Sequence, residues 1–222
     1  MQKNIKSRIG ILRSRIEEAC RKSRRETAEI RLIAVTKNFP STAVREAFNY
    51  GLIDFGENRV QEALAKYAEL EDIRNRITLH FIGHLQSNKV SDVLAAVDII
   101  HSIDTLRLAE LINNRTSRMV NVLLEVNLSG EQTKYGFSKE ELEGAVGSIS
   151  VLPNINVLGL MTVAPVCSNA EEVRPLFAEM KRINSGYGFR ELSMGMTDDF
   201  EVAVEEGATM IRIGRAIFGE RS

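Results

Sequence analysis

The feature that most constrains the fold of this chain is a repeated alternation between short apolar runs and longer segments of helical periodicity. The alternation starts at Arg31 and continues almost to the last residue. The apolar runs are rich in β-branched residues, and there are eight of them: 32–36, 52–55, 77–82, 98–102, 120–126, 157–162, 191–194 and 210–213. Such a pattern is typical of βα units, in which the strands lie parallel.

Eight parallel strands joined by helical crossovers indicate an α/β protein, and we predict a single closed (β/α)8 barrel of the TIM type. A doubly wound open sheet is the competing arrangement. A length of 222 residues fits one large domain or two small ones. Because no linker, low-complexity tract or shift in composition interrupts the series, we expect residues 1–222 to form a single domain.

The segment before the first run predicts an additional N-terminal helix. Its apolar residues recur at intervals of three or four and would form one stripe, made of Ile5, Ile9, Leu12, Ile16 and Ala19. Further along, Ser138 and Glu141 have the spacing of a capping box. Thr197, followed by two aspartates, predicts the N-cap of the last long helix, and Gly207 predicts its C-terminal end.

Composition and charge exclude several classes of partner. Lys and Arg number 29 and Asp and Glu number 30, so the formal net charge of −1 gives no general attraction to nucleic acid or to an anionic membrane. No apolar stretch reaches the 18 residues of a membrane span. Cys20 and Cys167 are too few for a disulfide framework, which favours a reducing compartment. We expect a cytoplasmic protein that binds neither nucleic acid nor membrane.

Lys37 is the first candidate functional residue, because it directly follows a wholly apolar strand. At the rim of a barrel core, desolvation would lower the pKa of its amine toward neutrality, and a neutral amine attacks aldehydes. Lys37 is therefore a candidate Schiff-base lysine. The alternative is a rim lysine that extends its ammonium group into solvent.

A second candidate region lies after the seventh and eighth strands, in the sequences SMGMTDD and RIGRAIFG. In barrels a phosphate often binds between these two loops, held by backbone N–H groups and approached closely at glycines. The residues that fit such a site are Ser193, Gly195, Thr197, Arg212, Gly214 and Arg215. Asp198 and Asp199 would oppose an anion if they pointed inward. Alternatively, the glycines only terminate strands.

A reactive lysine opposite a phosphate site is the combination that pyridoxal 5′-phosphate (PLP) requires, since its aldehyde and its phosphate lie at opposite sides of one ring. A metal site is not predicted, because His80, His84 and His101 lie in three segments without a partner ligand at metal-binding spacing. His80 falls within a strand, where we expect a hydrogen-bonded interior side chain.

The motifs AVTK, GENRVQE, HFIGHLQSNK, HSID, EQTKYGF, GLMTVAP and SMGMTDDFEVAVEEGATMIRIGRAIFG resemble the YggS/PROSC family of pyridoxal phosphate homeostasis proteins. The resemblance runs from the first strand to nearly the last residue. It implies a barrel similar to the N-terminal domain of alanine racemase, a fold-type III enzyme, with an extra N-terminal helix. It also implies that PLP is bound covalently, as an aldimine on Lys37.

The resemblance also assigns the remaining cofactor-binding residues by motif. Asn58 would lie beside the cofactor. The phosphate would be bound by Ser193, Met194, Thr197 and Gly214, and Arg212 would face the pyridine nitrogen or the phosphate. Thr197 stands where the family more often has serine, which keeps the hydroxyl group. An arginine at the ring nitrogen would leave the pyridine unprotonated and make it a poor electron sink.

From these features we predict a monomeric, non-catalytic carrier of PLP that acts in vitamin B6 homeostasis and either buffers the cofactor or delivers it to PLP-dependent apoenzymes. The main alternative is a small PLP-dependent amino-acid racemase. The sequence ends eight residues after Gly214, without the C-terminal β domain of racemases, and among its tyrosines Tyr135 is the nearest candidate for a second base. A third alternative is an interaction protein in which PLP is a structural ligand.

Overall fold

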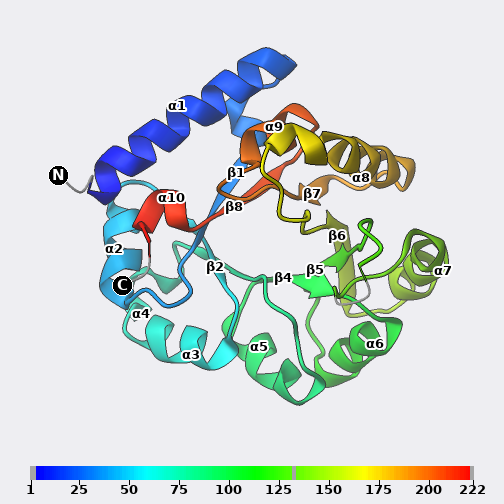
Figure 1. Ribbon diagram of the computed structural model, residues 1–222. Helices are drawn as coiled ribbons and strands as arrows, with labels where there is room; N and C mark the ends of the chain where they lie inside the picture. The colour runs from blue at the N-terminus through cyan, green and yellow to red at the C-terminus, as the bar shows by residue number, and fades with distance from the viewer. Residues whose placement is uncertain (1–3, 132–133, 221–222) are drawn as a thin grey trace.

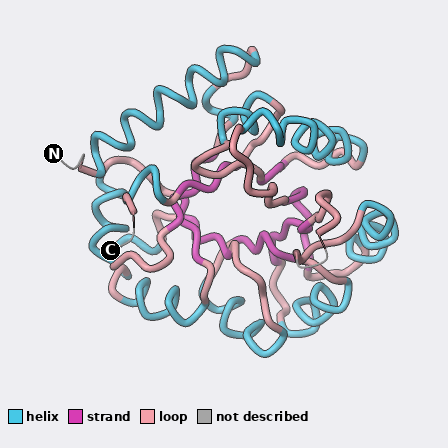
Figure 2. The backbone as a smooth tube through the Cα atoms, viewed as in Figure 1, coloured by secondary structure: helices cyan, strands magenta, loops and turns pink. Residues whose placement is uncertain are grey.

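Eight parallel strands form a closed barrel in chain order in the computed structural model, with β8 pairing with β1 to complete the ring. The structure describes residues 4–131 and 134–220, so residues 1–3, 132–133 and 221–222 of the predicted domain lie outside it. Figures 1 and 2 show the strands at the centre and the helices around them. The predicted barrel is confirmed, and the open sheet is wrong, because the first and last strands are hydrogen-bonded.

Every predicted apolar run overlaps a strand. The strands are β1 Arg31–Val35, β2 Asp54–Glu57, β3 Thr78–Phe81, β4 Ile99–Ile103, β5 Val120–Glu125, β6 Ile155–Met161, β7 Glu191–Ser193 and β8 Met210–Ile213. The strand β2 is shifted at both ends, because it begins and ends two residues later than predicted, and β6 begins two residues earlier than predicted. Leu52 is instead buried in the turn that precedes the strand.

The helices surround the barrel, and several of them pack their apolar faces against the strands. They are α1 Ile5–Ser23, α2 Ser41–Asn49, α3 Val60–Ala68, α4 Glu71–Arg74, α5 Val90–Ala96, α6 Leu106–Arg115, α7 Lys139–Ser150, α8 Arg174–Gly186, α9 Phe200–Glu205 and α10 Arg215–Phe218. The predicted N-terminal helix is α1, whose buried stripe faces α9 and α10 (Figure 1). Every helix in the described residues is too short or too polar to cross a membrane.

Two of the predicted helix boundaries are confirmed and one is wrong. Ser138 and Glu141 form the capping box of α7, and Gly207 follows α9 with a φ of 98°. Thr197, however, is not an N-cap, because α9 begins at Phe200 with Asp199 as its N-cap. The Asp199 carboxylate accepts a hydrogen bond from the N–H of Met196 at 2.5 Å. This contact closes a turn before the helix and leaves Thr197 in the loop.

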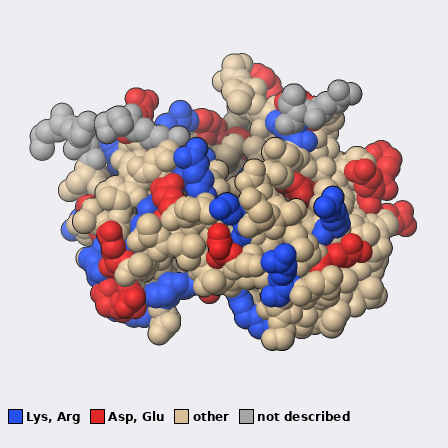
Figure 3. Space-filling model, turned by 90° about the horizontal axis from the view of Figure 1, so that it is seen from below, with Lys and Arg blue, Asp and Glu red and all other residues tan. Residues whose placement is uncertain are grey.

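Acidic and basic side chains are interspersed on the surface. Figure 3 shows one side of the barrel, on which lysine, arginine, aspartate and glutamate alternate with uncharged residues. This mixture agrees with the net charge of −1. On this side of the molecule no broad region of one sign would attract a polyanion.

The interior of the barrel is partly polar. An apolar layer of Ile33, Ile99, Leu123, Met161 and Met210 forms a cluster of its own, separate from the larger core between strands and helices. Next to this layer lie four buried polar side chains, those of His80, His101, Ser193 and Arg212. TIM barrels are usually filled by branched aliphatic residues. Four buried polar side chains are therefore unusual in such an interior, and we infer that they have a role besides filling it.

At Gly159 of β6 we expect any side chain to destabilise the folded protein. An added Cβ would lie 1.7 Å from the carbonyl oxygen of Glu191 on the neighbouring strand β7. We expect Gly159→Ala to lower the free energy of unfolding by about 2 kcal/mol or more, since the backbone must move. Gly147→Ala in α7, with nothing within 4 Å, should instead stabilise by about 0.5–1 kcal/mol. Urea denaturation of the two variants and the wild type checks both expectations. Equal denaturation midpoints in Gly159→Ala and Gly147→Ala would contradict the prediction.

Candidate functional site

A cavity of about 640 Å³ lies at the carboxyl end of the barrel. Five of the seven predicted cofactor-binding residues line it: Lys37, Asn58, Thr197, Arg212 and Gly214. Apolar side chains complete the wall, among them Val35, Ile82 and Val163. Residues distant in sequence meet here because parallel strands all end at the same rim.

Lys37 enters the cavity from a backbone that is anchored on both sides. Before it, the carbonyl of Thr36 accepts a hydrogen bond from Nζ of Lys66 at 2.6 Å. After it, Asn38 has a φ of 64°, and its N–H donates to the carboxylate of Glu62. These contacts fix the point at which the partly buried Lys37 side chain leaves β1.

The anchor behind Lys37 contains a buried ion pair. Nζ of Lys66 lies 2.6 Å from Glu57, and the two side chains are only 5% and 0% exposed. The hydroxyl of Thr36 also donates to Glu57, at 2.7 Å. Burial raises the pKa of Glu57, and the ammonium of Lys66 opposes that rise. The sequence did not reveal this role of Lys66, because its spacing from Glu62 resembles an ordinary surface pair.

Arg212 forms part of the cavity floor. Its guanidinium donates to Oγ of Ser193 at 2.7 Å and to the carbonyl of Thr162 at 2.8 Å. Burial lowers the pKa of Arg212 to about 10, while the carboxylates of Glu125 and Asp199 oppose the change. The group is therefore still a cation at neutral pH, and a ligand in the cavity meets a fixed positive charge.

Ser193 and Met194 lie behind the cavity wall rather than on it, since both are fully buried and neither is among the lining residues. The hydroxyl of Ser193 contacts Arg212 and His101. The N–H of Met194 donates to the carbonyl of Met210 within the sheet. The structure therefore does not bring the side chains of these two predicted phosphate ligands to the cavity.

The two aspartates that follow Thr197 are both engaged by neighbouring groups. Asp198 forms an ion pair with Arg215, at the edge of the cavity. Asp199 accepts from the N–H of Met196, as described above. Their charges are thus partly offset, which weakens the objection to an anion in this cavity.

The rim beyond β3, β4 and β5 carries His84, Asp104 and Tyr135. The ring of Tyr135 stacks on that of His84 with centroids 3.6 Å apart, and Nδ1 of His84 lies 3.1 Å from Asp104. In the described part of the chain, the residues that line the cavity do not include Tyr135. The described residues also hold no cluster of three or more His, Cys, Asp or Glu suited to a metal ion.

Glu125 is a titratable group of the barrel interior that the sequence did not single out. It lies at the end of β5, on the same face as the interior residue Leu123. Burial raises the pKa of Glu125 to about 7, the carboxylate of Asp104 adds to the rise, and Arg212 opposes it. The carboxyl group is therefore a proton acceptor in the neutral pH range.

This raised pKa predicts a loss of stability as pH increases. The folded state binds the Glu125 proton more tightly than the unfolded state, so the contribution of Glu125 to stability is fully present below about pH 4 and is lost as pH rises through about 7, by at most about 3 kcal/mol. Glu125→Gln should remove this part of the slope and be more stable than the wild type at pH 8. Urea denaturation of the cofactor-free protein at pH 5 and pH 8 tests it, with exposed Glu110→Gln as the control. If the free energy of unfolding changed equally between pH 5 and pH 8 in Glu125→Gln and Glu110→Gln, the prediction would be contradicted.

The chain matches known families along nearly its whole length. The family model for the alanine racemase N-terminal domain matches residues 8–222. The pyridoxal phosphate homeostasis protein of Aquifex aeolicus is 42% identical over 98% of this chain and 99% of its own length. That of Pseudomonas aeruginosa is 40% identical over 98% of this chain and 96% of its own.

Solved structures agree with these matches. The structure of PipY from Synechococcus elongatus with PLP bound is 38% identical, covers 97% of this chain and all of its own, and superposes with a TM-score of 0.85. Alanine racemase from Corynebacterium glutamicum, at 16% identity and a TM-score of 0.68, shares the fold over 94% of this chain and 61% of its own. The chain therefore belongs to the family of pyridoxal phosphate homeostasis proteins, which have the fold of the alanine racemase N-terminal domain.

Proposed function

We propose that this protein binds PLP covalently through Nζ of Lys37 and acts as a non-catalytic carrier in PLP homeostasis. The observation that carries the proposal is one cavity that joins an anchored lysine to a buried, charged arginine, Arg212. We further propose that residues 1–222 work as a single domain, as a monomer, in the cytoplasm. The family membership and the PLP named in the PipY structure support the choice of ligand.

The residues present fit this ligand. When bound, pyridoxal phosphate supplies an aldehyde that condenses with an amine, releasing water, and a phosphate that needs cationic or hydrogen-bonding partners. Lys37 is the amine of the cavity, and Arg212 is its buried cation. Oδ1 of Asn58 is buried and has no hydrogen-bond partner among the described residues. Since such a group is costly unless a ligand satisfies it, Asn58 supports a polar ligand in this place.

The remaining roles follow from position. The hydroxyl of Thr197 and the close backbone approach permitted by Gly214 would hold the phosphate. An added Cβ at Gly214 would come within 3.3 Å of the Val35 carbonyl. Ser193 and Met194 would support these groups from behind the wall. Arg212 would orient the ring or the phosphate and keep its positive charge while doing so.

The contacts of Tyr135 favour a carrier over a racemase. Two-base racemisation needs an acid and a base on opposite faces of the ring. Tyr135, the nearest candidate for a second base, stacks on His84 at the rim and is 55% exposed. The racemase alternative is tested with the PLP-loaded protein and single enantiomers of alanine, serine and lysine. Racemisation that disappears in Lys37→Ala would overturn the carrier proposal.

The binding proposal is tested on the purified wild-type protein. It should be yellow after incubation with PLP, and borohydride reduction followed by peptide mapping should locate one pyridoxyl group on Lys37. Delivery is tested by mixing the loaded protein with a PLP-dependent apoenzyme and following the appearance of its activity. A protein that takes up no PLP contradicts the binding proposal, whereas a loaded protein that never activates an apoenzyme contradicts delivery.

A further inference from the structure

A row of buried polar side chains crosses the barrel interior beneath the cavity. Its members come from five different strands: Arg212, Ser193, His101, His80 and Asp54. Each contacts the next within hydrogen-bond distance. The guanidinium of Arg212 lies 2.7 Å from Oγ of Ser193, which lies 3.0 Å from Nδ1 of His101. Nε2 of His101 lies 2.9 Å from Nδ1 of His80, and Nε2 of His80 lies 3.0 Å from the carboxylate of Asp54. All five side chains are buried.

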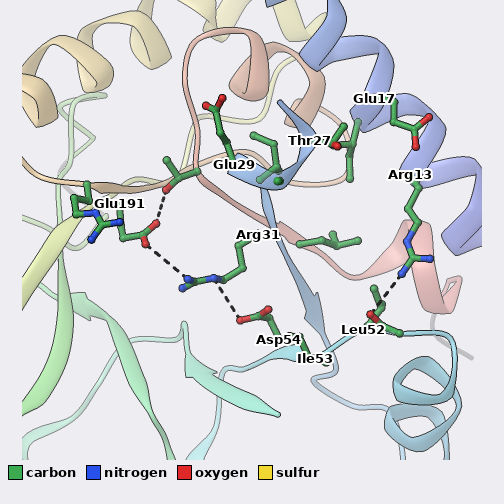
Figure 4. Close-up of a pocket in the computed structure, with 16 residues that line it drawn as sticks. Arg13, Glu17, Thr27, Glu29, Arg31, Leu52, Ile53, Asp54 and Glu191 are labelled. Carbon is green, nitrogen blue, oxygen red and sulfur yellow. Dashed lines mark hydrogen bonds and ion pairs between the residues drawn. The ribbon is translucent and has the colours of Figure 1, made fainter. Parts of the chain in front are cut away.

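The row connects the two ends of the barrel. Arg212 lines the candidate cofactor cavity, whereas Asp54 lines a second cavity of about 680 Å³ near the amino ends of the strands. Figure 4 shows this second cavity, in which Arg31 lies between Asp54 and Glu191. The corresponding distances from the Arg31 guanidinium are 3.7 Å and 3.8 Å. The row therefore ends, near the amino ends of the strands, at the carboxylate of Asp54, with the guanidinium of Arg31 beside it.

The chemistry of the groups gives the row one direction. A guanidinium can only donate, so the oxygen of Ser193 accepts from Arg212. The hydroxyl hydrogen of Ser193 is then free to be donated to Nδ1 of His101, and a neutral His101 must carry its own hydrogen on Nε2. That hydrogen is donated to Nδ1 of His80, which in turn donates from Nε2 to the Asp54 carboxylate. The hydrogens on Ser193 Oγ, His101 Nε2 and His80 Nε2 then each have an acceptor.

The electrostatic surroundings agree with a neutral His101 ring. Burial lowers the pKa of His101 well below its ordinary value, and the guanidinium groups of Arg212 and Arg31 lower it further. In the reverse assignment the hydrogen of His101 is on Nδ1. Both Arg212 and His101 would then donate to the oxygen of Ser193, and the hydroxyl hydrogen of Ser193 could no longer be donated to His101. A buried donor without an acceptor is costly, so the direction from Arg212 to Asp54 is favoured.

We propose that His101 and His80 are positioning residues of the cofactor site, which hold the guanidinium of Arg212 through Ser193 by a hydrogen-bond chain that runs in one direction to Asp54. This inference rests on the proposed PLP site insofar as Arg212 is the group that would meet the cofactor. Donation by Ser193 makes its oxygen a stronger acceptor, because neighbouring hydrogen bonds polarise one another. Two of the five N–H groups of Arg212 are thereby directed to Ser193 and Thr162.

The first test is made on the cofactor-free protein and does not depend on PLP binding. Long-range ¹H–¹⁵N spectra of the three histidines, assigned with single His→Gln variants, report which ring nitrogen carries the hydrogen. We expect His101 and His80 to be neutral Nε2–H tautomers at pH 7. A hydrogen on Nδ1 of His101, or a doubly protonated His80, would overturn the proposed chain.

The second test measures PLP affinity in His101→Leu, with His84→Leu as the matched control, since His84 lies at the rim outside the chain. We expect about tenfold weaker binding in His101→Leu, the cost of one buried polar group left unsatisfied, and binding like the wild type in the control. His101→Asn should recover part of the affinity, because its amide oxygen can accept from Ser193.

The outcomes separate this inference from the proposed function. A wild-type protein that binds no PLP would contradict the proposed function, while the tautomers would still decide whether the chain exists. A wild type that binds PLP, with equal affinity in His101→Leu and His84→Leu, would overturn the positioning role alone. If His101→Leu does not fold, the tautomers and the affinity of His101→Asn relative to the control decide the matter.

Discussion

Replacement of Lys37 by alanine is expected to abolish the covalent attachment of PLP. Nζ of Lys37 is the amine that the cavity presents, while Arg212, Asn58 and Thr197 stay in place in the variant. The variant should therefore still bind PLP, but only reversibly and more weakly. The measurement is the intact mass after incubation with PLP and borohydride reduction, which should show one added pyridoxyl group in the wild type and none in Lys37→Ala.

A second lysine provides the control for this experiment. Lys89 lies in a short 3₁₀ helix, Ser87–Lys89, after β3. Lys89→Ala should keep the full pyridoxyl adduct on Lys37, because the residue does not line the cavity. If Lys37→Ala still carried one stoichiometric pyridoxyl group on another lysine, the assignment of Lys37 would be wrong.

Replacement of Lys66 by methionine is expected to cause the largest loss of stability among the substitutions proposed. The change removes the cation from Glu57, whose side chain has no exposed surface and whose Oε2 already has no partner in the described structure. Breaking a buried ion pair by removing one partner costs about 3–5 kcal/mol. Because Lys66 also binds the carbonyl of Thr36, the backbone that presents Lys37 should loosen, and PLP affinity should fall with stability.

The pH dependence of this loss has a definite sign. Without Lys66, burial would raise the pKa of Glu57 further, so the folded state would hold the proton more tightly than the unfolded state does. The contribution of Glu57 to the stability of the variant would then be fully present below the unfolded pKa of about 4.3 and be lost as pH rises. Urea denaturation at pH 5 and pH 8 should show the larger difference from the wild type at pH 8.

An exposed ion pair of the same length is the matched control. Nζ of Lys139 lies 2.6 Å from Glu179, as Nζ of Lys66 does from Glu57, but these side chains are 52% and 32% exposed. Lys139→Met should change stability by about 1 kcal/mol or less, since solvent screens such pairs. Equal losses in Lys66→Met and Lys139→Met would show that burial does not control the energy of the inner pair.

Much of the site could be predicted because barrel topology translates sequence position into spatial position. The parallel strands all end at one rim, and Lys37, Asn58 and Gly214, which come soon after three of these strands, line one cavity. Thr197 reached the same cavity although its predicted role as an N-cap was wrong. Its helix starts later because the carboxylate of Asp199 closes the preceding turn.

The sequence by itself determined the eight βα units, the N-terminal helix and the rim that holds the candidate site, because apolar periodicity is a local property and each strand or helix displays it separately. Only the tertiary structure decided that Lys66 is buried against Glu57 and that His80, His101, Ser193 and Arg212 form one row. Those contacts join residues from separate elements, up to 92 positions apart in the case of His101 and Ser193. They depend on the register of neighbouring strands and on which side chains face inward, and neither is encoded in the period of a single segment.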